Sequence, residues 1–142
     1  MAKFNIISQF LKDISFESPN VPELFFKNDN GQAKLEINID IQIKGADNNL
    51  FMVDVITKVH SKLEAGEKSI FLIESTYSGL VQLDGEVADE EDKKRTLLID
   101  VPTLLFPAVR ALVTRLTSES GFPTFTMQPV DFAQLYEQKQ AQ

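Results

Sequence analysis

The clearest pattern in the chain is a strict alternation of apolar and polar residues between positions 34 and 44. The odd positions carry Leu35 and then isoleucine at each step to Ile43, and the even positions carry charged or amide side chains. Neighbouring side chains on a β-strand point to opposite faces, so the alternation predicts a strand with one buried and one wet face. Such strands are typical of antiparallel sheets.

Three other segments have the composition and spacing of strands, and turn residues separate the last three strands. The chain therefore predicts four strands, at about residues 3–18, 34–45, 50–65 and 69–83. Short turns join the second strand to the third and the third to the fourth, which makes these neighbours antiparallel.

The start of the fourth expected strand is apolar on both faces. Phe71 and Ile73 have one parity. Ile70 and Leu72 have the other, which Glu74 shares. Either the strand is central in a two-sided core, or one of its faces is an interaction surface. The parity of Glu74 predicts a half-exposed apolar patch of Ile70 and Leu72 beside a carboxylate.

Helical spacing begins only after the four strands. Between residues 102 and 120, apolar side chains recur every three or four positions, as in an amphipathic helix. Pro107 falls inside this pattern, so the helix either bends there or begins at Phe106. Asp100 is placed to cap the helix and Gly121 to end it. The stripe consists of Leu105, Val109, Leu112, Val113 and Leu116.

Two polar stretches interrupt the regular patterns. Residues 84–96 hold four consecutive acids followed by three bases, and we expect a solvated loop. Residues 18–33 are rich in proline, asparagine and glycine, which also predicts a loop, with turn chemistry at 28–31. This second loop holds Leu24, Phe25 and Phe26, which either pack beneath it or line a binding surface.

The order of the elements predicts the fold class. Strands followed by helices favour an α+β fold, with a four-stranded antiparallel sheet and two helices on one face. The second helix is short, at about residues 131–138, and a polar tail follows at 139–142. The length of 142 residues suits one domain spanning the whole chain.

Composition narrows the possible partners and compartments. The formal net charge of −7 disfavours binding to the phosphate backbone of nucleic acids. Cysteine is absent, which excludes disulfides, thiolate metal sites and thiol catalysis. The N-terminus lacks the apolar run of a signal peptide, and no window approaches 18 apolar residues. We therefore expect a cytoplasmic protein without stable membrane insertion.

The residue types that usually carry catalysis do not form a constellation. The single histidine, His60, lies on an expected strand, and the phosphate-binding, zinc-binding and nucleophile motifs are absent. We expect no metal, no cofactor and no enzymatic activity. The apolar surface exceeds what one small sheet and two helices can hide. The sequence thus favours a binding or scaffolding protein that self-associates.

Three stretches resemble the SecB family of bacterial export chaperones. They are K-D-I-S-F-E-S-P-N-V-P (12–22), L-F-P-A-V-R (105–110) and G-F-P-T-F-T-M-Q-P-V-D-F-A-Q-L-Y (121–136). Their order and spacing match as well, so the resemblance covers about residues 10–137. It implies an ATP-independent holdase that binds unfolded preproteins and delivers them to the SecA translocation motor. It also implies a homotetramer, built as a dimer of dimers.

The resemblance assigns roles to residues at matching positions. It implies SecA docking on the acidic outer face of the sheet, at Asp13, Glu17, Leu72 and Glu74. It places unfolded clients in a groove between the loop after the first strand and the last helix, lined by Leu24, Phe25, Phe26, Phe122, Phe125, Phe132, Leu135 and Tyr136. Subunit contacts are expected from two sets, Phe71, Ile73, Ser75 and Tyr77 on the fourth strand and Val109, Leu112, Val113 and Leu116 on the long helix.

Two alternative functions remain open. One is a SecB-like chaperone retargeted to another client, such as an antitoxin, and the presence of Asp13, Glu17 and Glu74 counts against it. The other is an α+β protein that binds a small ligand in a closed pocket formed by its phenylalanines.

Overall fold

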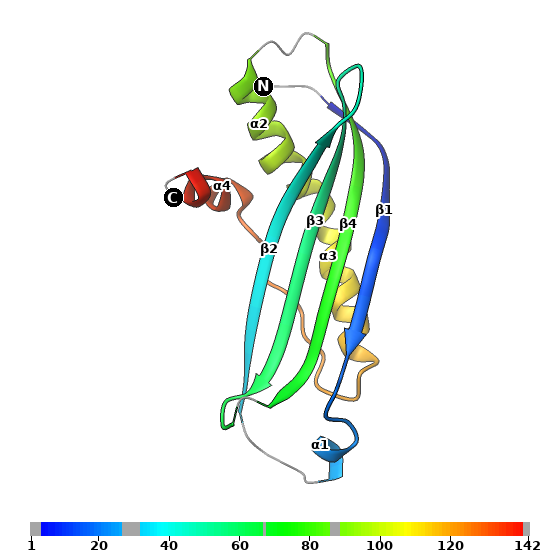
Figure 1. Cartoon of the computed structure of the whole chain (residues 1–142), viewed down its shortest axis with the longest axis vertical. Helices are drawn as coiled ribbons and strands as arrows, with labels where there is room; N and C mark the ends of the chain where they lie inside the picture. Colours follow the sequence, from blue (N-terminus) through cyan, green and yellow to red (C-terminus); the bar gives the residue numbers. More distant parts are fainter. Residues whose placement is uncertain (1–3, 27–31, 67, 86–88, 141–142) are drawn as a thin grey trace.

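The computed structural model describes residues 4–26, 32–66, 68–85 and 89–140. Its main feature is one antiparallel sheet with the strand order β1-β4-β3-β2 (Figure 1). The result confirms the predicted four-stranded antiparallel sheet. The turn predicted at 28–31 lies outside the described residues. The strands are β1 Phe4–Glu17, β2 Ala33–Gly45, β3 Leu50–Leu63 and β4 Ser69–Leu83.

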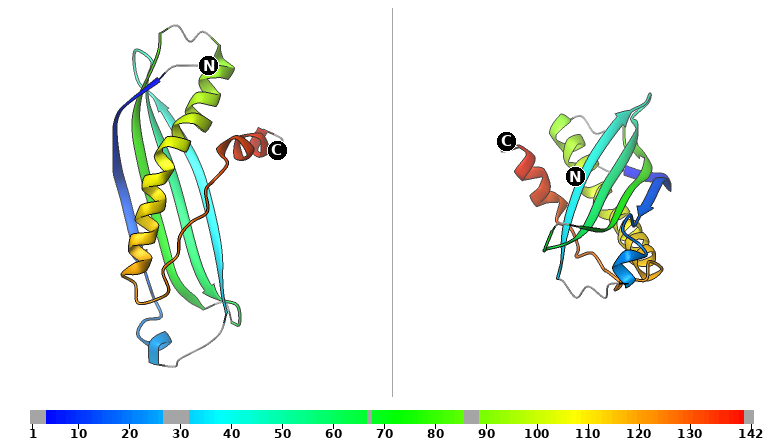
Figure 2. Two further views of the ribbon diagram at one scale, coloured as in Figure 1. Left: turned by 180° about the vertical axis from the view of Figure 1, so that it is seen from behind. Right: turned by 60° about the horizontal axis from the view of Figure 1, so that its bottom comes forward.

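A long helix lies on one face of the sheet, a one-turn helix lies beyond the end of the sheet, and the other face is open (Figure 2). The long helix runs along the sheet, and an extended segment then returns beside it to the last helix. The helical elements are α1 Glu23–Phe26, α2 Glu90–Arg95, the π-helical segment η1 Thr96–Asp100, α3 Val101–Ser118 and α4 Phe132–Gln140. This confirms the predicted α+β class.

The long helix begins earlier than predicted. It is continuous from Glu90 to Ser118, so the expectation of a loop throughout 84–96 is wrong. The carboxylate of Asp89 accepts a hydrogen bond from the amide of Glu91 at 3.0 Å and caps this helix. The acids Glu90, Glu91 and Asp92 in the first turn also suit the helix dipole. Asp100, the predicted cap, makes no side-chain capping bond and lies inside the helix.

Two prolines lie within the continuous helix. Pro102 lacks an amide hydrogen, and the preceding residues form the π-helical segment η1, in which the amide of Val101 bonds the carbonyl of Thr96. Pro107 lies inside α3, so the helix does not begin at Phe106. One turn of helix, α1, also follows Pro22 in a stretch that was expected to be a loop.

By length and composition alone, the helix from Glu90 to Ser118 could cross a membrane. Its apolar stripe is already occupied, however, because Val101, Leu105, Val109 and Val113 are fully buried against the sheet. A core helix of this kind meets the same criterion as a membrane span. We therefore assign it to the core.

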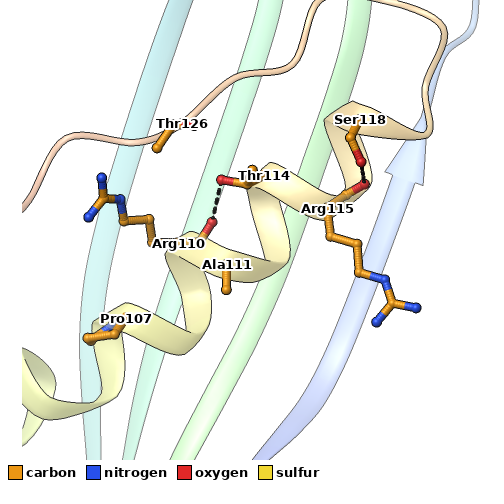
Figure 3. A pocket seen from close by; sticks show the side chains of 7 residues that line it. All are labelled: Pro107, Arg110, Ala111, Thr114, Arg115, Ser118 and Thr126. Carbon is orange, nitrogen blue, oxygen red and sulfur yellow. Dashed lines mark hydrogen bonds between the residues drawn. The ribbon is translucent and has the colours of Figure 1, made fainter.

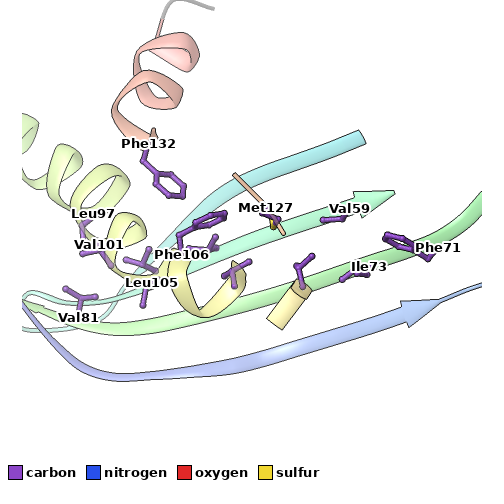
Figure 4. Packing of buried hydrophobic residues seen from close by; sticks show 14 of the residues in the cluster. Val59, Phe71, Ile73, Val81, Leu97, Val101, Leu105, Phe106, Met127 and Phe132 are labelled. Atoms are coloured by element: carbon purple, nitrogen blue, oxygen red, sulfur yellow. The ribbon is translucent and has the colours of Figure 1, made fainter. Parts of the chain in front are cut away.

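The core lies between α3 and the centre of the sheet (Figure 4). Helix and strand approach most closely at Gly79 of β4, where an added Cβ would lie 3.1 Å from Cδ2 of Leu105. Several hydroxyl side chains are buried, among them those of Thr57 and its cross-strand neighbour Ser75. Neither hydroxyl has a hydrogen-bond partner among the described residues. Unpaired buried hydroxyls of this kind reduce stability.

Candidate functional site

A row of stacked aromatic rings joins four separate parts of the chain at one end of the sheet. Phe16 of β1 stacks on Phe71 of β4 with ring centroids 5.8 Å apart. Phe71 lies 6.5 Å from Phe122, which follows α3, and Phe122 stacks on Phe25 of α1 at 4.9 Å. The structure thus brings together Phe25 and Phe122, which were predicted on opposite walls of one groove. The pair encloses the corner at Gly121.

Gly121 fits this corner for two separate reasons. Its φ of +87° is one that residues with a Cβ rarely adopt. An added Cβ would also lie only 3.0 Å from Cζ of Phe25. The helix ends at Ser118 with Glu119 as its C-cap, so Gly121 lies one position beyond the predicted C′ site. There it allows the chain to turn and leaves room for the ring of Phe25.

The phenylalanines of the first loop differ in how far they pack against the rest of the chain. Phe25 packs on Phe122 but remains 46% exposed, and Phe26 is 80% exposed. Leu24 is half-buried against the core. A side chain as apolar as Phe26 gains free energy when a partner covers it. The end of α1 therefore exposes apolar side chains that a partner could cover.

The other predicted groove residues gather around α4, away from this aromatic row. Phe132 is buried edge-on to Phe106, with centroids 5.7 Å apart, and Tyr136 is also buried. Phe125 is half-buried and lies between the two ends, with its amide bonded to the hydroxyl of Thr117. A hollow of about 210 Å³ opens beside α4, lined by Ile41, Leu98, Phe132, Leu135, Tyr136, Lys139 and Gln140.

Polar contacts hold α4 in place beside this hollow. The hydroxyl of Tyr136 donates a hydrogen bond to Oε1 of Glu91 at 2.9 Å, and the guanidinium of Arg95 lies 5.5 Å from the ring centroid. Nζ of Lys139 lies 2.6 Å from Oδ1 of Asp40 on β2. The hydrogen bond to Glu91, together with burial, raises the pKa of Tyr136.

An apolar track along β2 links the two groups of predicted groove residues. Leu35 and Ile37 are each 41% exposed on the helix side of the sheet, and Ile39 is half-buried. Leu35 lies in register with Ser61, which in turn pairs with Phe71 of the aromatic row. At the other end, Ile41 lines the hollow beside α4. We call Leu35, Ile37, Ile39 and Ile41 the apolar track.

The apolar track was not among the sites predicted from the sequence. Alternation identifies which side of a strand is apolar, and it does not show how far the covering helices reach. The extended return of the chain after α3 leaves the first half of β2 uncovered, which no local pattern indicates.

The open face of the sheet brings together all four residues predicted for docking. Glu17 pairs in register with Leu72, and Asp13 pairs with Thr76, two residues beyond Glu74. Asp13, Glu17 and Glu74 are exposed, and Leu72 is half-buried. They therefore lie close together on one face of two adjacent strands.

The predicted patch of Ile70 and Leu72 is wrong. Ile70 is only 8% exposed and belongs to the core. The register between β3 and β4 shifts between Ser61 and Lys62, which leaves Ile70 as an extra residue opposite β3. A single inserted residue breaks the parity on which the prediction rested, and Leu72 is left as the apolar member of the patch.

Lysines are interspersed with the carboxylates of the open face, so it is less uniformly acidic than the resemblance implies. Nζ of Lys58 lies 3.7 Å from Oε1 of Glu74, and Lys62 pairs with Glu36 at 3.4 Å. Lys12 pairs with the buried Asp54 at 3.4 Å, and Oγ of Ser78 donates to the same carboxylate at 2.6 Å. Within the described part of the chain, Asp13 and Glu17 have no ion-pair partner.

Most residues predicted at subunit contacts lie inside the protomer instead. Phe71, Ile73 and Ser75 are buried on β4, and Val109 and Val113 are buried on the side of α3 that faces the sheet. Tyr77, Leu112 and Leu116 are half-buried. The physical reason is that the apolar stripe of α3 covers the sheet of its own chain.

The outward side of α3 has a different character. An open depression of about 560 Å³ lies there, between α3 and the extended segment that returns beside the helix (Figure 3). The small side chain of Ala111 lies between the longer ones of Arg110 and Arg115. The depression is lined by Pro107, Arg110, Ala111, Thr114, Arg115, Ser118 and Thr126.

The described residues contain no cluster of metal-binding side chains. No group of three or more His, Asp or Glu side chains is placed to hold a metal ion in this part of the chain. Nε2 of His60 lies 3.0 Å from Oγ of Ser69 on the neighbouring strand, which gives the ring a structural partner.

Comparison with known proteins agrees with this picture. The chain matches the family model described as preprotein translocase subunit SecB over residues 1–142. It is 35% identical to the protein-export protein SecB of Caulobacter vibrioides, over 99% of this chain and 83% of that protein. It is 32% identical to the putative protein-export protein SecB of Pelagibacter ubique, over 96% of each chain.

A solved structure with the same fold is the SecB-like chaperone Rv1957 of Mycobacterium tuberculosis, in complex with a ChAD peptide from the HigA1 antitoxin. The TM-score is 0.68 at 16% identity, over 89% of this chain and 90% of that chain, so this likeness concerns the fold alone. The family model and the sequence relatives cover the full domain, and the chain belongs to the SecB family of protein-export chaperones.

Proposed function

We propose that this chain holds unfolded preproteins without ATP and delivers them to the SecA motor in the cytoplasm. The observation that carries the proposal is the apolar track on β2, which runs between the aromatic row at Phe25 and the hollow beside α4. An unfolded chain exposes apolar side chains over a long stretch, whereas a folded protein hides them. An elongated apolar surface therefore selects unfolded chains by their length as well as their composition.

The exposed rings at the end of α1 suit clients of many sequences. Phe25 and Phe26 offer large faces without a hydrogen-bonding group, so they accept different apolar partners with little loss. Binding that depends on apolar area alone is also reversible, which delivery of the client requires. No nucleotide is needed for such release when SecA competes for the client.

A refolding assay tests the holdase function. An unfolded preprotein that refolds slowly is diluted into buffer with and without this protein, in the absence of ATP. We expect refolding to slow markedly at stoichiometric concentrations and to resume when SecA is added. Unchanged refolding would contradict the proposal, and a folded form of the same preprotein serves as the control, since it should not bind.

We also propose that SecA docks on the open face of the sheet at Asp13, Glu17, Leu72 and Glu74. Support comes from their adjacency on β1 and β4 and from the absence of ion-pair partners for Asp13 and Glu17 within the described residues. Open carboxylates attract a cationic partner, and the half-buried Leu72 adds apolar contact.

The proposed assembly is a homotetramer, formed as a dimer of dimers. The outward side of α3 is the surface we assign to the contact between dimers, because Ala111 permits close approach and the depression beside it can receive side chains of another helix. Light scattering should give a mass near four times 16.0 kDa. A monomer at micromolar concentration would contradict the assembly, and Ala111→Glu, which places charge in the contact, should lower the mass.

Two other functions fit less well. The SecB-like chaperone with an antitoxin peptide shares the fold, and a retargeted client is the second candidate on that ground. The grouping of Asp13, Glu17 and Glu74 favours SecA instead. A small-ligand function in a closed pocket of phenylalanines is disfavoured, because the hollow that Phe132 lines has about 210 Å³, and ligand pockets usually have roughly 300–1,000 Å³. The larger depression on α3 is open and has no phenylalanine in its lining.

A further inference from the structure

Lys58 lies at the edge of the patch proposed for SecA docking. Across the open face of the sheet, Glu74 of β4 pairs in register with Lys58 of β3. Nζ of Lys58 is 3.7 Å from Oε1 of Glu74, and the side chains are 52% and 51% exposed. One of the three acids of the patch therefore already has a cation beside it.

The other lysines paired on this face are engaged elsewhere. Lys12 is held by the buried carboxylate of Asp54, which Ser78 also bonds. Lys62 pairs with Glu36 on β2, at the far side of the sheet from β1. Among the ion pairs of the described residues, the pair formed by Lys58 is the one that involves a docking carboxylate.

Because this ion pair is exposed, a partner can compete with it. Ion pairs in water are weak, so a cationic side chain of a partner can displace the ammonium group of Lys58 from Glu74. The displaced lysine remains on the adjacent strand and repels the incoming cation. Asp13 and Glu17 on β1 carry no such competitor among the described residues.

We propose that Lys58 is a specificity residue of the docking face, which competes with a cationic partner for Glu74 and lowers its affinity. The proposal rests on the docking of SecA on this face. A partner that contacts only Glu74 gains little binding free energy, because its cation merely takes the place of the ammonium group of Lys58. A partner with cations or donors placed to reach Asp13 and Glu17 as well binds despite the competition. Lys58 therefore discriminates a matched basic surface from isolated basic residues.

The test compares two substitutions that remove the same charge from the same face. Lys58→Gln is expected to tighten SecA binding about two- to fivefold, which corresponds to the energy of an exposed ion pair. Lys62→Gln is the matched control, because its partner Glu36 lies outside the docking patch. It should leave the affinity unchanged apart from the long-range effect of net charge, which both variants share.

A double-mutant cycle of Lys58 and Glu74 tests whether the change in SecA affinity arises from their interaction. The affinities are measured by titration calorimetry at low and at physiological salt. Glu74→Gln should cost more affinity in the Lys58→Gln background than in the wild type, because the partner then uses Glu74 fully. Equal tightening by both lysine variants, or no change with Lys58→Gln while Asp13→Asn weakens binding, overturns the role of Lys58 and leaves SecA docking intact. Failure of the wild type to bind SecA overturns the docking proposal itself.

Discussion

Leu105→Ala is expected to lower the free energy of unfolding by about 2–5 kcal/mol. Leu105 is completely buried, and its methyl groups fill the space above Gly79, so their loss leaves a cavity between helix and sheet. Neighbouring atoms cannot close this cavity, because the rigid strand forms one of its walls. Unfolding in urea at a fixed protein concentration measures the change, since subunit association adds to apparent stability.

The adjacent residue provides the control for this experiment. Leu104 carries the same side chain one position earlier, but it is 56% exposed on the outward side of α3. Leu104→Ala should change the stability of the protomer by no more than about 0.5 kcal/mol. Equal destabilisation by the two substitutions would show that α3 does not face the sheet as described.

Replacing Leu35 and Ile37 together by serine is expected to weaken the binding of unfolded preprotein about tenfold or more. Each side chain is partly exposed on the apolar track, and a bound client would cover what remains. Covering half of such a side chain contributes about 1 kcal/mol, so the pair contributes about 2 kcal/mol. Equilibrium binding of a fluorescently labelled, reduced and unfolded preprotein measures the loss.

Asn38→Ser is the matched control for this second experiment. Asn38 lies on the same strand but points to the open face, where it pairs in register with Lys58. Its replacement should leave client binding unchanged. If the double variant binds as tightly as the wild type while it remains folded, the apolar track is not the client surface. If the control loses as much affinity, the effect belongs to the stability of β2.

The elements that a local pattern determines were predictable from the sequence. The alternation at 34–44 identifies β2 because each residue type there depends only on which side of the sheet it faces. The start of the long helix was missed because the run of four acids and three bases within residues 84–96 was interpreted as a solvated loop, whereas the structure has a helix there, capped by Asp89. Packing against the sheet stabilises the helix enough to accommodate Pro102 and Pro107, and packing is not visible in a short window.

The roles of apolar residues were harder to predict than their spacing. The apolar stripe that includes Val109 and Val113 was correctly predicted as one face of a helix. Its spacing does not show whether that face packs on the sheet of its own chain or on a second subunit. The contact of Phe25 with Phe122 likewise joins segments far apart in the chain. The ion pair between Lys58 and Glu74 depends on the register of two strands, which the sequence alone did not specify.

The corner at Gly121 limits how relatives of this protein can diverge. A substitution of Phe25 by a smaller side chain would remove the steric conflict with a Cβ at position 121. It would not remove the backbone strain, which comes from the positive φ. A relative without this glycine therefore needs a smaller side chain at position 25 and still carries a backbone penalty of about 1–2 kcal/mol, unless the turn itself changes.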